Sequence, residues 1–447
     1  ASLLMVPSTY EAGKLYNVLP SGNRAPDSKG GAGYDQTRAD FDFDRGSNAA
    51  ATRINSSGLI EKYRENLLTE SNNFSDSDWT KTKVDLTSGQ LGYDGTNNAW
   101  LMQTNTTGSY PRVTQSGLST DVNTFSIYAK AGNSSHLFLL NNRAGADTKA
   151  WFDLSNGTIG TGTEFIDRKI EDVGNGWYRC SVTSSFTDTS YYVASVDGDN
   201  IITGTIGDSI YIQSAQLETG MVSTDYLNST SVTAKAGVLI DLPRINYDAN
   251  GENGALLLEP SRKNGNANSE YFSGTGFGIV AATATANVTT SPEGVINATS
   301  LIGSTSSAQH IIYTTGLSTY NGDTTISIFA KANGYDYFVL GAGAQSTNKP
   351  VLFNIANGTK VGNFTGWASY GAPIDSDIED YGNGWYRLSV TFAATSGTNT
   401  NMFFGSMPTD SVASGTTIQN GTNGSYIFGA MIEAGSYSSS YIPNHGE

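Results

Sequence analysis

The sequence Gly174–Thr183, GNGWYRCSVT, returns with a single change as Gly382–Thr391, GNGWYRLSVT. In each copy a Gly-Asn-Gly turn precedes residues that would point alternately to the two faces of a β-strand. One face carries Tyr, then Cys in the first copy or Leu in the second, then Val. The other face carries Trp, Arg, Ser and Thr. The change from Cys180 to Leu388 falls on the apolar face, so we expect this face to line a core. Cys180 is then a small buried hydrophobe rather than a nucleophile.

The repeat extends far beyond this strand. Matching segments occur in the same order in both halves of the chain, and the separation between them never shrinks along the sequence. This pattern is typical of a duplicated domain with loop insertions in the second copy. The further pairs include Arg64–Ser75 with Arg262–Ser273, Thr124–Gly132 with Thr325–Asn333, Phe152–Thr158 with Phe353–Thr359, and Ala215–Gly220 with Ala430–Gly435.

Composition and turn chemistry favour an all-β fold. The 447 residues include 51 Gly and 24 Tyr, and only 15% are charged. Short alternating runs separated by Asn-Gly and Asp-Gly turns predict strands rather than helices. We expect two tandem antiparallel β-sandwich domains of the jelly-roll type, with a small β-rich platform built from the N-terminal and linker segments. Ser56–Leu67 is the exception, because Ile60, Tyr63 and Leu67 have the spacing of a short helix.

Charge and cysteine content argue against several classes of protein. Lys and Arg number 25 against 41 Asp and Glu, a formal net charge of −16, which disfavours binding to nucleic acid or to anionic membranes. No apolar run approaches the roughly 20 residues that span a bilayer. The start, Ala1–Tyr10, lacks the basic and apolar regions of a secretory signal. Cys180 is the one cysteine, so no intrachain disulfide can form and we expect a fold held by packing.

The polar face of the repeated strands supplies the candidate ligand-binding residues. An aromatic ring can stack on the apolar face of a sugar while a neighbouring Arg or Lys donates hydrogen bonds to its hydroxyl groups. Trp and Arg can instead pack against each other or under a covering loop, in a cation–π arrangement, and a motif repeated beside a tight turn favours this structural interpretation. The candidates are Trp177, Arg179, Tyr128 and Lys130 in the first copy, and Trp385, Arg387, Phe329 and Lys331 in the second.

No specific catalytic or metal-binding motif is present in the sequence. None of the histidines, His136, His310 and His445, has a His or Cys at metal-ligand spacing. Asp40–Gly46 opens like a calcium loop, but Ala51 occupies the twelfth position, where an EF-hand requires Glu. We therefore predict a protein that is not an enzyme and uses no cofactor. A structural calcium ion bound by loop carboxylates stays an open alternative.

Several segments resemble proteins of a known type. The leader segments of tailed-bacteriophage fibre and appendage proteins are similar to Gly13–Gly22, Asp40–Glu61, Leu242–Asp248 and Ala255–Asn264. The duplicated block, Glu65–Gly220 in the first copy, resembles the carbohydrate-binding-like, concanavalin-type jelly-roll domain that often follows this leader. The second copy departs from the pattern at its start, where Trp79 of the first copy has no counterpart.

The resemblance implies a bacteriophage virion structural protein: a head or tail fibre, a spike or a surface decoration whose two lectin-like domains bind host-surface glycans. It implies that the N-terminal segment binds other virion proteins, and that the chain is located in the virion after assembly in the host cytoplasm. It also implies a homo-oligomer, often a trimer, although no coiled-coil heptads support one. Two alternatives stay open: the non-catalytic carbohydrate-binding part of a polysaccharide-degrading system, and a structural capsid or tail spacer without a glycan ligand.

In proteins of this type the leader segments lie close together in the sequence, whereas here the first copy separates them. We therefore expect the two segments to form one platform, with contacts between Ile54–Ile60 and Leu239–Leu258. The expected division of the chain is 1–64 for the N-terminal virion-docking and platform segment, 65–229 for the first jelly-roll domain, 230–263 for the linker that returns to the platform, and 264–447 for the second jelly-roll domain.

Overall fold

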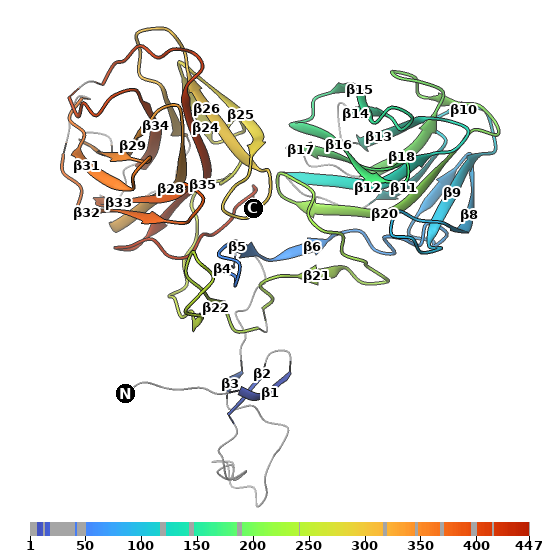
Figure 1. Ribbon diagram of the computed structural model, residues 1–447, viewed down its shortest axis with the longest axis horizontal. Helices are drawn as coiled ribbons and strands as arrows, with labels where there is room; N and C mark the ends of the chain where they lie inside the picture. The colour runs from blue at the N-terminus through green and yellow to red at the C-terminus, as the bar shows by residue number, and fades with distance from the viewer. Residues whose placement is uncertain are drawn as a thin grey trace, which may run out of the picture.

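The computed structural model describes residues 7–11, 14–17, 41–42, 51–116, 122–142, 147–185, 190–240, 242–315, 320–344, 347–366, 371–394, 400–413 and 415–446. Every regular element among them is a β-strand, and none of these residues belongs to a helix that could cross a membrane. The strands form two β-sandwiches that stand on a small platform (Figure 1). The expected all-β fold with two tandem sandwiches is confirmed.

The first sandwich packs two six-stranded antiparallel sheets against each other. We call the sheet that faces the platform the platform-side sheet, and the other the opposite sheet. The platform-side sheet has the order β16 (Asp167–Gly174), β17 (Trp177–Ser184), β12 (Asn123–Ala131), β20 (Ser209–Thr219), β9 (Ala99–Thr104) and β8 (Val84–Gln90). The opposite sheet has the order β15 (Thr158–Thr163), β14 (Thr148–Asp153), β13 (His136–Asn142), β18 (Ser190–Val196), β11 (Arg112–Ser116) and β7 (Thr80–Thr82). A short ladder joins β10 (Gly108–Ser109) and β19 (Thr203–Gly204).

The second sandwich has the same two sheets. Its platform-side sheet has the order β32 (Asp375–Asp380), β33 (Tyr386–Ala394), β28 (Gly322–Asn333), β35 (Gly424–Ala434), β26 (Ala298–Gly303) and β25 (Ala282–Thr289). Its opposite sheet has the order β31 (Thr359–Asn363), β30 (Thr347–Asn354), β29 (Tyr337–Ala344), β34 (Thr400–Met407), β27 (Ile311–Thr314) and β24 (Phe277–Val280).

Each strand of these two sheets has a counterpart at the same place in the first sandwich. Even an irregularity recurs, because the pairing register shifts between Ser126 and Tyr128 in β12 and between Ser327 and Phe329 in β28. The sequence repeat therefore encodes one fold twice.

The repeated strand presents its two faces as the alternation predicts. Cys180 and Leu388 are fully buried in the cores between the sheets. Burial raises the pKa of the Cys180 thiol well above its usual range, which keeps the side chain a neutral hydrophobe. Asn175 and Gly176, between β16 and β17, both have positive φ, as a two-residue hairpin turn of type I′ requires.

A second turn is repeated in the two sandwiches. It joins β14 to β15 in the first and β30 to β31 in the second, and it needs glycine because a tyrosine ring fills the adjacent space. A Cβ atom added to Gly157 would lie 2.6 Å from the ring of Tyr178. In the second sandwich a Cβ atom on Gly358 would lie 2.5 Å from the ring of Tyr386. Both tyrosines pack at the edge of their cores, so the turn and the repeated strand depend on each other.

After its last strand each sandwich sends a segment back to the outer face of its platform-side sheet. We call these segments, 221–229 and 436–446, the first and second straps. The Glu218 carboxylate accepts hydrogen bonds from the Thr224 backbone N at 2.8 Å and from the Thr224 hydroxyl at 2.6 Å. Glu433 accepts the equivalent bonds from Ser439 at 2.9 and 2.7 Å. A buried carboxylate therefore holds each strap in place.

A tyrosine anchors the other part of each strap. The Tyr226 hydroxyl lies 2.7 Å from Ser71 Oγ, and the Tyr441 hydroxyl lies 2.7 Å from Ser269 Oγ. Both rings join apolar clusters on the outer face of their platform-side sheets. The straps thus cover part of a surface that would otherwise face water.

The platform combines two segments that the first sandwich separates in the sequence. β6 (Arg64–Asn66) pairs with β21 (Ala234–Ala236). Ile54 N donates to Asn246 Oδ1 at 2.7 Å, and the Ile54 carbonyl accepts from Tyr247 N at 3.0 Å. The contacts expected between Ile54–Ile60 and Leu239–Leu258 are therefore present. The platform strands are β4 (Thr52–Ile54), β5 (Ile60–Lys62), β6 (Arg64–Asn66), β21 (Ala234–Ala236), β22 (Ile245–Asn246) and β23 (Ala255–Leu256).

The short helix expected over Ser56–Leu67 is wrong. Ile60 pairs with Ile54 in a hairpin, and the next strand, β6, pairs with β21. Cross-strand pairing outweighs the local helical spacing, because tertiary context overrides weak propensities. A separate sheet is formed by β1 (Pro7–Glu11), β2 (Lys14–Asn17) and β3 (Phe41–Asp42), and most of the calcium-like stretch Asp40–Gly46 lies outside the described residues.

The β4–β5 hairpin covers the outer face of the platform-side sheet of the second sandwich. Ile60 is buried in a cluster with Trp385, Phe329 and Tyr441. The Thr52 hydroxyl donates to the Tyr441 carbonyl at 2.6 Å and so ties the hairpin to the second strap. The second sandwich therefore completes its outer face with residues that precede the first sandwich in the sequence.

Replacement of Ile60 by alanine should selectively destabilise the second sandwich. The change leaves a cavity in the cluster around Trp385, so we expect the free energy of unfolding of that sandwich to fall by about 2–4 kcal/mol. Hydrogen exchange measured by mass spectrometry would report each sandwich separately. Ile206→Ala is the matched control, because Ile206 is 63% exposed. Equal loss of protection in both sandwiches, or no loss, would contradict the assignment of the hairpin as a cover of the second.

Candidate functional site

The aromatic candidates of the first copy are buried rather than displayed. Trp177 is 1% exposed and packs with Ala99, Tyr128, Tyr93 and Tyr226. The ring of Tyr93 stacks on that of Tyr128, with 3.7 Å between the centroids. Neighbours thus cover both candidate rings, which leaves no room for a sugar against them.

The second copy repeats this burial. Trp385 is 2% exposed, and its indole Nε1 donates to the Thr290 carbonyl at 3.0 Å. Phe329 is buried among Tyr381, Phe428 and Tyr441. The sugar-stacking interpretation of Trp177, Tyr128, Trp385 and Phe329 therefore gives way to the structural interpretation, because the ring faces are occupied by the fold itself.

The two candidate lysines lie beside the repeated Asn-Gly turns. Lys130 Nζ donates to the Asn175 carbonyl at 2.8 Å. The stem of Lys331 lies close to Gly384, where an added Cβ atom would be 3.5 Å from Lys331 Cε. Both lysines contact the turn that precedes the repeated strand, and we assign them a role in holding it.

The two candidate arginines are buried but not fully hydrogen-bonded. Arg179 is 8% exposed and lies 5.3 Å from the ring centroid of Tyr128, and Arg387 is 4% exposed and lies 5.4 Å from that of Phe329. These contacts are cation–π arrangements, but each arginine packs on the Tyr or Phe ring of the neighbouring strand rather than on the Trp of its own strand, the pairing expected from the sequence. The Nε atom of each arginine has no hydrogen-bond partner among the described residues. A buried guanidinium N–H without a partner is costly, so each position calls for an acceptor.

Arg179 lines a cavity of about 320 Å³, which we call the first pocket. Ser223 and Thr224 of the first strap, Arg64 of the platform and Glu293 of the second sandwich also line it. Three parts of the fold therefore meet around this arginine.

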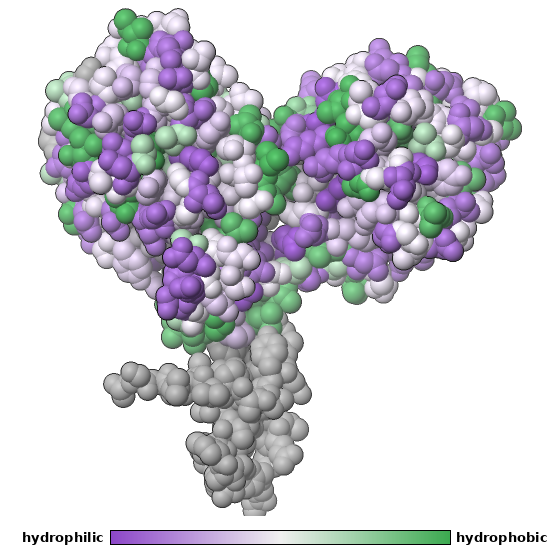
Figure 2. Space-filling model, in the orientation of Figure 1, coloured by the Kyte–Doolittle hydropathy of each residue, from purple (hydrophilic) through white to green (hydrophobic). Residues whose placement is uncertain are grey.

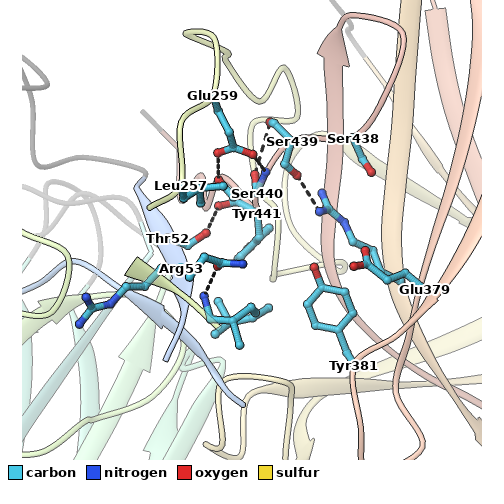
Figure 3. Close-up of a pocket in the computed structure, with 14 residues that line it drawn as sticks. Thr52, Arg53, Leu257, Glu259, Glu379, Tyr381, Ser438, Ser439, Ser440 and Tyr441 are labelled. Carbon is cyan, nitrogen blue, oxygen red and sulfur yellow. Dashed lines mark hydrogen bonds between the residues drawn. The ribbon is translucent and has the colours of Figure 1, made fainter. Parts of the chain in front are cut away.

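Arg387 lines a smaller cavity of about 160 Å³, the second pocket (Figure 3). Its Nη1 donates to the Ser439 carbonyl of the second strap at 2.6 Å. Figure 3 shows Glu259 close to Ser439 and Ser440 of the strap. Glu259 accepts from Ser440 N at 2.7 Å and from Ser440 Oγ at 2.6 Å, which ties the platform to the strap.

The two pockets occupy equivalent places in the two sandwiches. Each lies between the outward-facing arginine of the repeated strand and the strap residue held by the buried glutamate, Thr224 in the first sandwich and Ser439 in the second. Ile60 of the platform lines both. Otherwise different platform residues line them, Lys62 and Arg64 in the first pocket and Arg53 and Glu259 in the second.

A buried cluster of charges lies next to the first pocket. Lys62 Nζ lies 3.2 Å from Glu270 Oε1 and 3.1 Å from Glu293 Oε1. The Tyr441 hydroxyl donates to Glu270 Oε1 at 3.0 Å, and His445 Nε2 lies 3.6 Å from the same oxygen. One platform lysine thus pairs with two carboxylates of the second sandwich, and one of these, Glu270, also contacts the end of the second strap.

The pKa values in this cluster are set by burial and by the lysine. Burial alone would lower the pKa of Lys62, but the two carboxylates outweigh it and hold the pKa above its usual range. Burial raises the pKa of Glu293 to about 7, with Lys62 opposing the shift and Glu270 adding to it. Burial lowers the pKa of His445 to about 4, although Glu270 opposes the shift. Near neutral pH, Glu293 is therefore the group in the cluster that changes charge.

Sequence reasoning missed the platform contributions to both pockets. Arg64 opens a repeated segment that carries no sign of a site, Glu293 belongs to no repeated motif, and only the fold brings them together. A signal did exist for the straps, because the spacing from Glu218 to Thr224 and Tyr226 recurs in the second copy.

The opposite sheet of the first sandwich carries a further partly exposed cation–aromatic pair. Arg112 lies 4.3 Å from the ring centroid of Tyr192. Ile311 and Phe403 occupy the equivalent positions in the second copy. This pair is thus not repeated, and it borders neither arginine pocket.

Among the described residues, no group of three or more His, Cys, Asp and Glu side chains could hold a metal ion. The His310 ring contacts the carbonyls of Ala281 and Thr417 at 2.7 and 3.0 Å, so it serves packing.

Comparisons with known proteins add no evidence on the fold, so its assignment rests on the strand pairing described above. No family model matches the sequence, and no curated protein matches it. Among solved structures, the chain is similar to the N-terminal CBM22-1–CBM22-2 tandem domain from Paenibacillus barcinonensis Xyn10C. The identity is 13%, the match covers 83% of this chain and 98% of that chain, and the TM-score is 0.27. A likeness this distant carries no argument about function, and the virion role stays a prediction.

Replacement of Glu293 by glutamine should change stability in a pH-dependent way. The raised pKa means that the folded state binds a proton more tightly than the unfolded state, so stability falls as pH rises from 4.5 to about 7. The variant escapes this loss, and we expect it to be more stable than the wild type by about 1–3 kcal/mol at pH 8 but nearly equal at pH 4.5. Urea unfolding at both pH values measures the difference.

The control for this experiment is Glu171→Gln, because Glu171 is an exposed residue of an edge strand. It should show no comparable pH dependence. Lower stability of Glu293→Gln at pH 8 would instead show that the ionised carboxylate is a net stabilising partner of Lys62.

Proposed function

We propose that this protein is a non-catalytic glycan-binding protein of a bacteriophage virion, a fibre, spike or surface decoration, in which each sandwich binds a saccharide in its arginine pocket. The observation that carries the proposal is the recurrence of one pocket in both copies. In each, a buried arginine with an unpartnered Nε, Arg179 or Arg387, lies beside a hydroxyl-bearing strap. Buried polar groups normally have hydrogen-bond partners, so a buried donor that lacks one in both copies favours a ligand.

The chemistry of the pockets suits saccharides. Guanidinium N–H groups donate to hydroxyl or carboxylate oxygens, and strap residues such as Ser223 and Ser438 supply hydroxyls that donate and accept. Affinity in one small polar pocket is modest. Two pockets in one chain, multiplied by the symmetry of an oligomer, would raise the avidity for a surface that displays many copies of a glycan.

The arrangement of the chain supports attachment at one end. The β1–β3 sheet lies on the far side of the platform from the two sandwiches (Figure 1). On the face of the two sandwiches that Figure 2 shows, polar residues are widely spread and hydrophobic residues form small patches. Docking through the N-terminal segment would leave both sandwiches directed outward, as the resemblance to fibre and appendage proteins implies.

Two other functions make different predictions. A structural spacer would bind no glycan, and its arginines would serve packing alone. The accessory part of a polysaccharide-degrading system would bind glycan but would reside with a catalytic partner instead of on a virion.

Glycan-array binding of the full chain tests the proposal. We expect Arg179→Lys and Arg387→Lys each to weaken binding, and the double variant to lose more than about tenfold, because lysine keeps the charge but not the planar set of donors. Arg112→Lys, on the opposite sheet, is the matched control and should bind as the wild type does. Thermal unfolding of every variant checks that the fold is retained. Absence of any glycan ligand, or full binding by a folded double variant, would rule out the arginine pockets as the sites.

Immunogold labelling tests the virion placement separately. Antibodies raised against the full chain should label intact bacteriophage particles at defined positions on the head or tail. Label confined to a secreted polysaccharide-degrading complex would favour the accessory function instead.

A further inference from the structure

We propose that the first pocket is specific for a saccharide that bears a carboxylate, such as a uronic acid residue, and that Arg64 and Arg179 bind the carboxylate. This inference rests on the proposed function and names the ligand class of one of its two sites. It is carried by the charges around the first pocket, by the unused donors of Arg179 and by the size of the cavity.

Several charges near the first pocket already have partners within the protein. Lys62 is held by Glu270 and Glu293 at 3.2 and 3.1 Å. Glu61 is paired with Arg53, whose Nε lies 2.7 Å from the Glu61 carboxylate. The Arg53–Glu61 pair cancels, and Lys62 balances Glu270 once Glu293 is protonated, which leaves the remaining cations to set the charge of the pocket wall.

Arg64 and Arg179 are the cations left over. Neither forms an ion pair with any residue that the structure describes. Asp225 at the pocket is exposed, and Glu171, opposite Arg179 on the neighbouring strand, is exposed as well. The buried Glu218 carboxylate is already bonded to the first strap. In a chain of net charge −16, two arginines without partners on one cavity wall mark a place for an anion.

Arg179 has the donors for such a ligand. Its only side-chain hydrogen bond within the described part of the chain runs from Nη2 to Ser126 Oγ at 3.1 Å. Arg387 in the second pocket makes the equivalent bond to Ser327 and also donates from Nη1 to the strap carbonyl of Ser439. Arg179 therefore keeps more of its five N–H donors free, and a guanidinium group matches a carboxylate through two parallel hydrogen bonds.

The size and remaining walls of the first pocket fit a sugar rather than a bare ion. Its volume of about 320 Å³ falls within the range of ligand pockets and leaves more room for a substituted sugar than the second pocket, at about 160 Å³. Asn55, Ser223 and Thr224 can bond to ring hydroxyls, while Ile60 and Val295 offer apolar contact to the ring. A small inorganic anion would leave most of these groups unused.

Glu293 makes the binding depend on pH. Its carboxylate lines the first pocket and would repel a bound carboxylate when ionised. With a pKa of about 7, it loses its charge between pH 8 and pH 6, and an acidic saccharide should then bind more tightly. The charged or titratable groups around Glu293 and this pocket are Lys62, Glu270, His445, Tyr441, Glu61, Arg64, Asp225 and Arg179.

Titration calorimetry of the full chain with glucuronic acid, its methyl ester, glucose and glucose 6-sulfate tests the inference. We expect glucuronic acid to bind at least about tenfold more tightly than the ester or glucose, and more tightly at pH 6 than at pH 8. Arg64→Gln should remove this preference. Arg64 is only partly buried, so this variant also guards against a failure of Arg179→Lys to fold. Arg262→Gln, at the equivalent position of the second copy, should keep the preference.

The outcomes separate this inference from the proposed function. Equal binding of acid and ester, with glycan binding otherwise retained, would overturn the inference and leave the proposed function standing. Tighter binding of glucose 6-sulfate than of glucuronic acid would overturn the choice of a carboxylate. Binding of glucuronic acid that survives in Arg64→Gln would place the acid elsewhere. Absence of binding to every probe, together with a silent glycan array, would overturn both.

Discussion

Each sandwich has a platform-side sheet whose outer face is apolar at its centre, and this face has to be covered. Trp177 and Trp385 lie there, next to an arginine that packs on an aromatic ring. A surface of this kind left in water would cost several kcal/mol of hydrophobic free energy. The first sandwich covers it with its own residues, Tyr93 and Tyr226, whereas the second requires Ile60 from the platform. This requirement makes one body out of segments that lie far apart in the sequence.

The same cover creates the pockets. Strap and platform residues pack against the aromatic rings, while cavities of about 320 and 160 Å³ lie beside the guanidinium groups. The buried cluster of Lys62, Glu270 and Glu293 reinforces this arrangement at the junction of platform and second sandwich. A buried ion pair of this sort adds specificity of docking more than stability, since desolvation offsets most of its attraction. Structural cover and candidate binding site are therefore one feature.

Much of the fold could be predicted from the sequence, because strand alternation and turn residues are properties of short segments. Strand alternation assigned Cys180 and Leu388 to the core, the Asn-Gly pairs marked the hairpin turns, and the repeat required one topology in both halves. The helix expected over Ser56–Leu67 failed where local spacing competed with long-range pairing to β21. The candidate site was foreseen only in part. Arg179 and Arg387 were singled out, but beside rings that the fold turns out to bury.

The sequence by itself determined which residues face inward and outward along each strand, because a period of two is a property of the extended backbone. Only the tertiary structure decided which outward residues reach a cavity and which are covered. Ile60 lies far from Trp385 in the sequence, and Arg64 lies far from Arg179. No local sequence pattern therefore predicts that the members of either pair lie in the same cluster or pocket. The burial of Ile60 against Trp385 and the placement of Arg64 and Arg179 at one pocket follow from the return of residues 230–263 to the N-terminal hairpin, a consequence of long-range packing rather than of propensity.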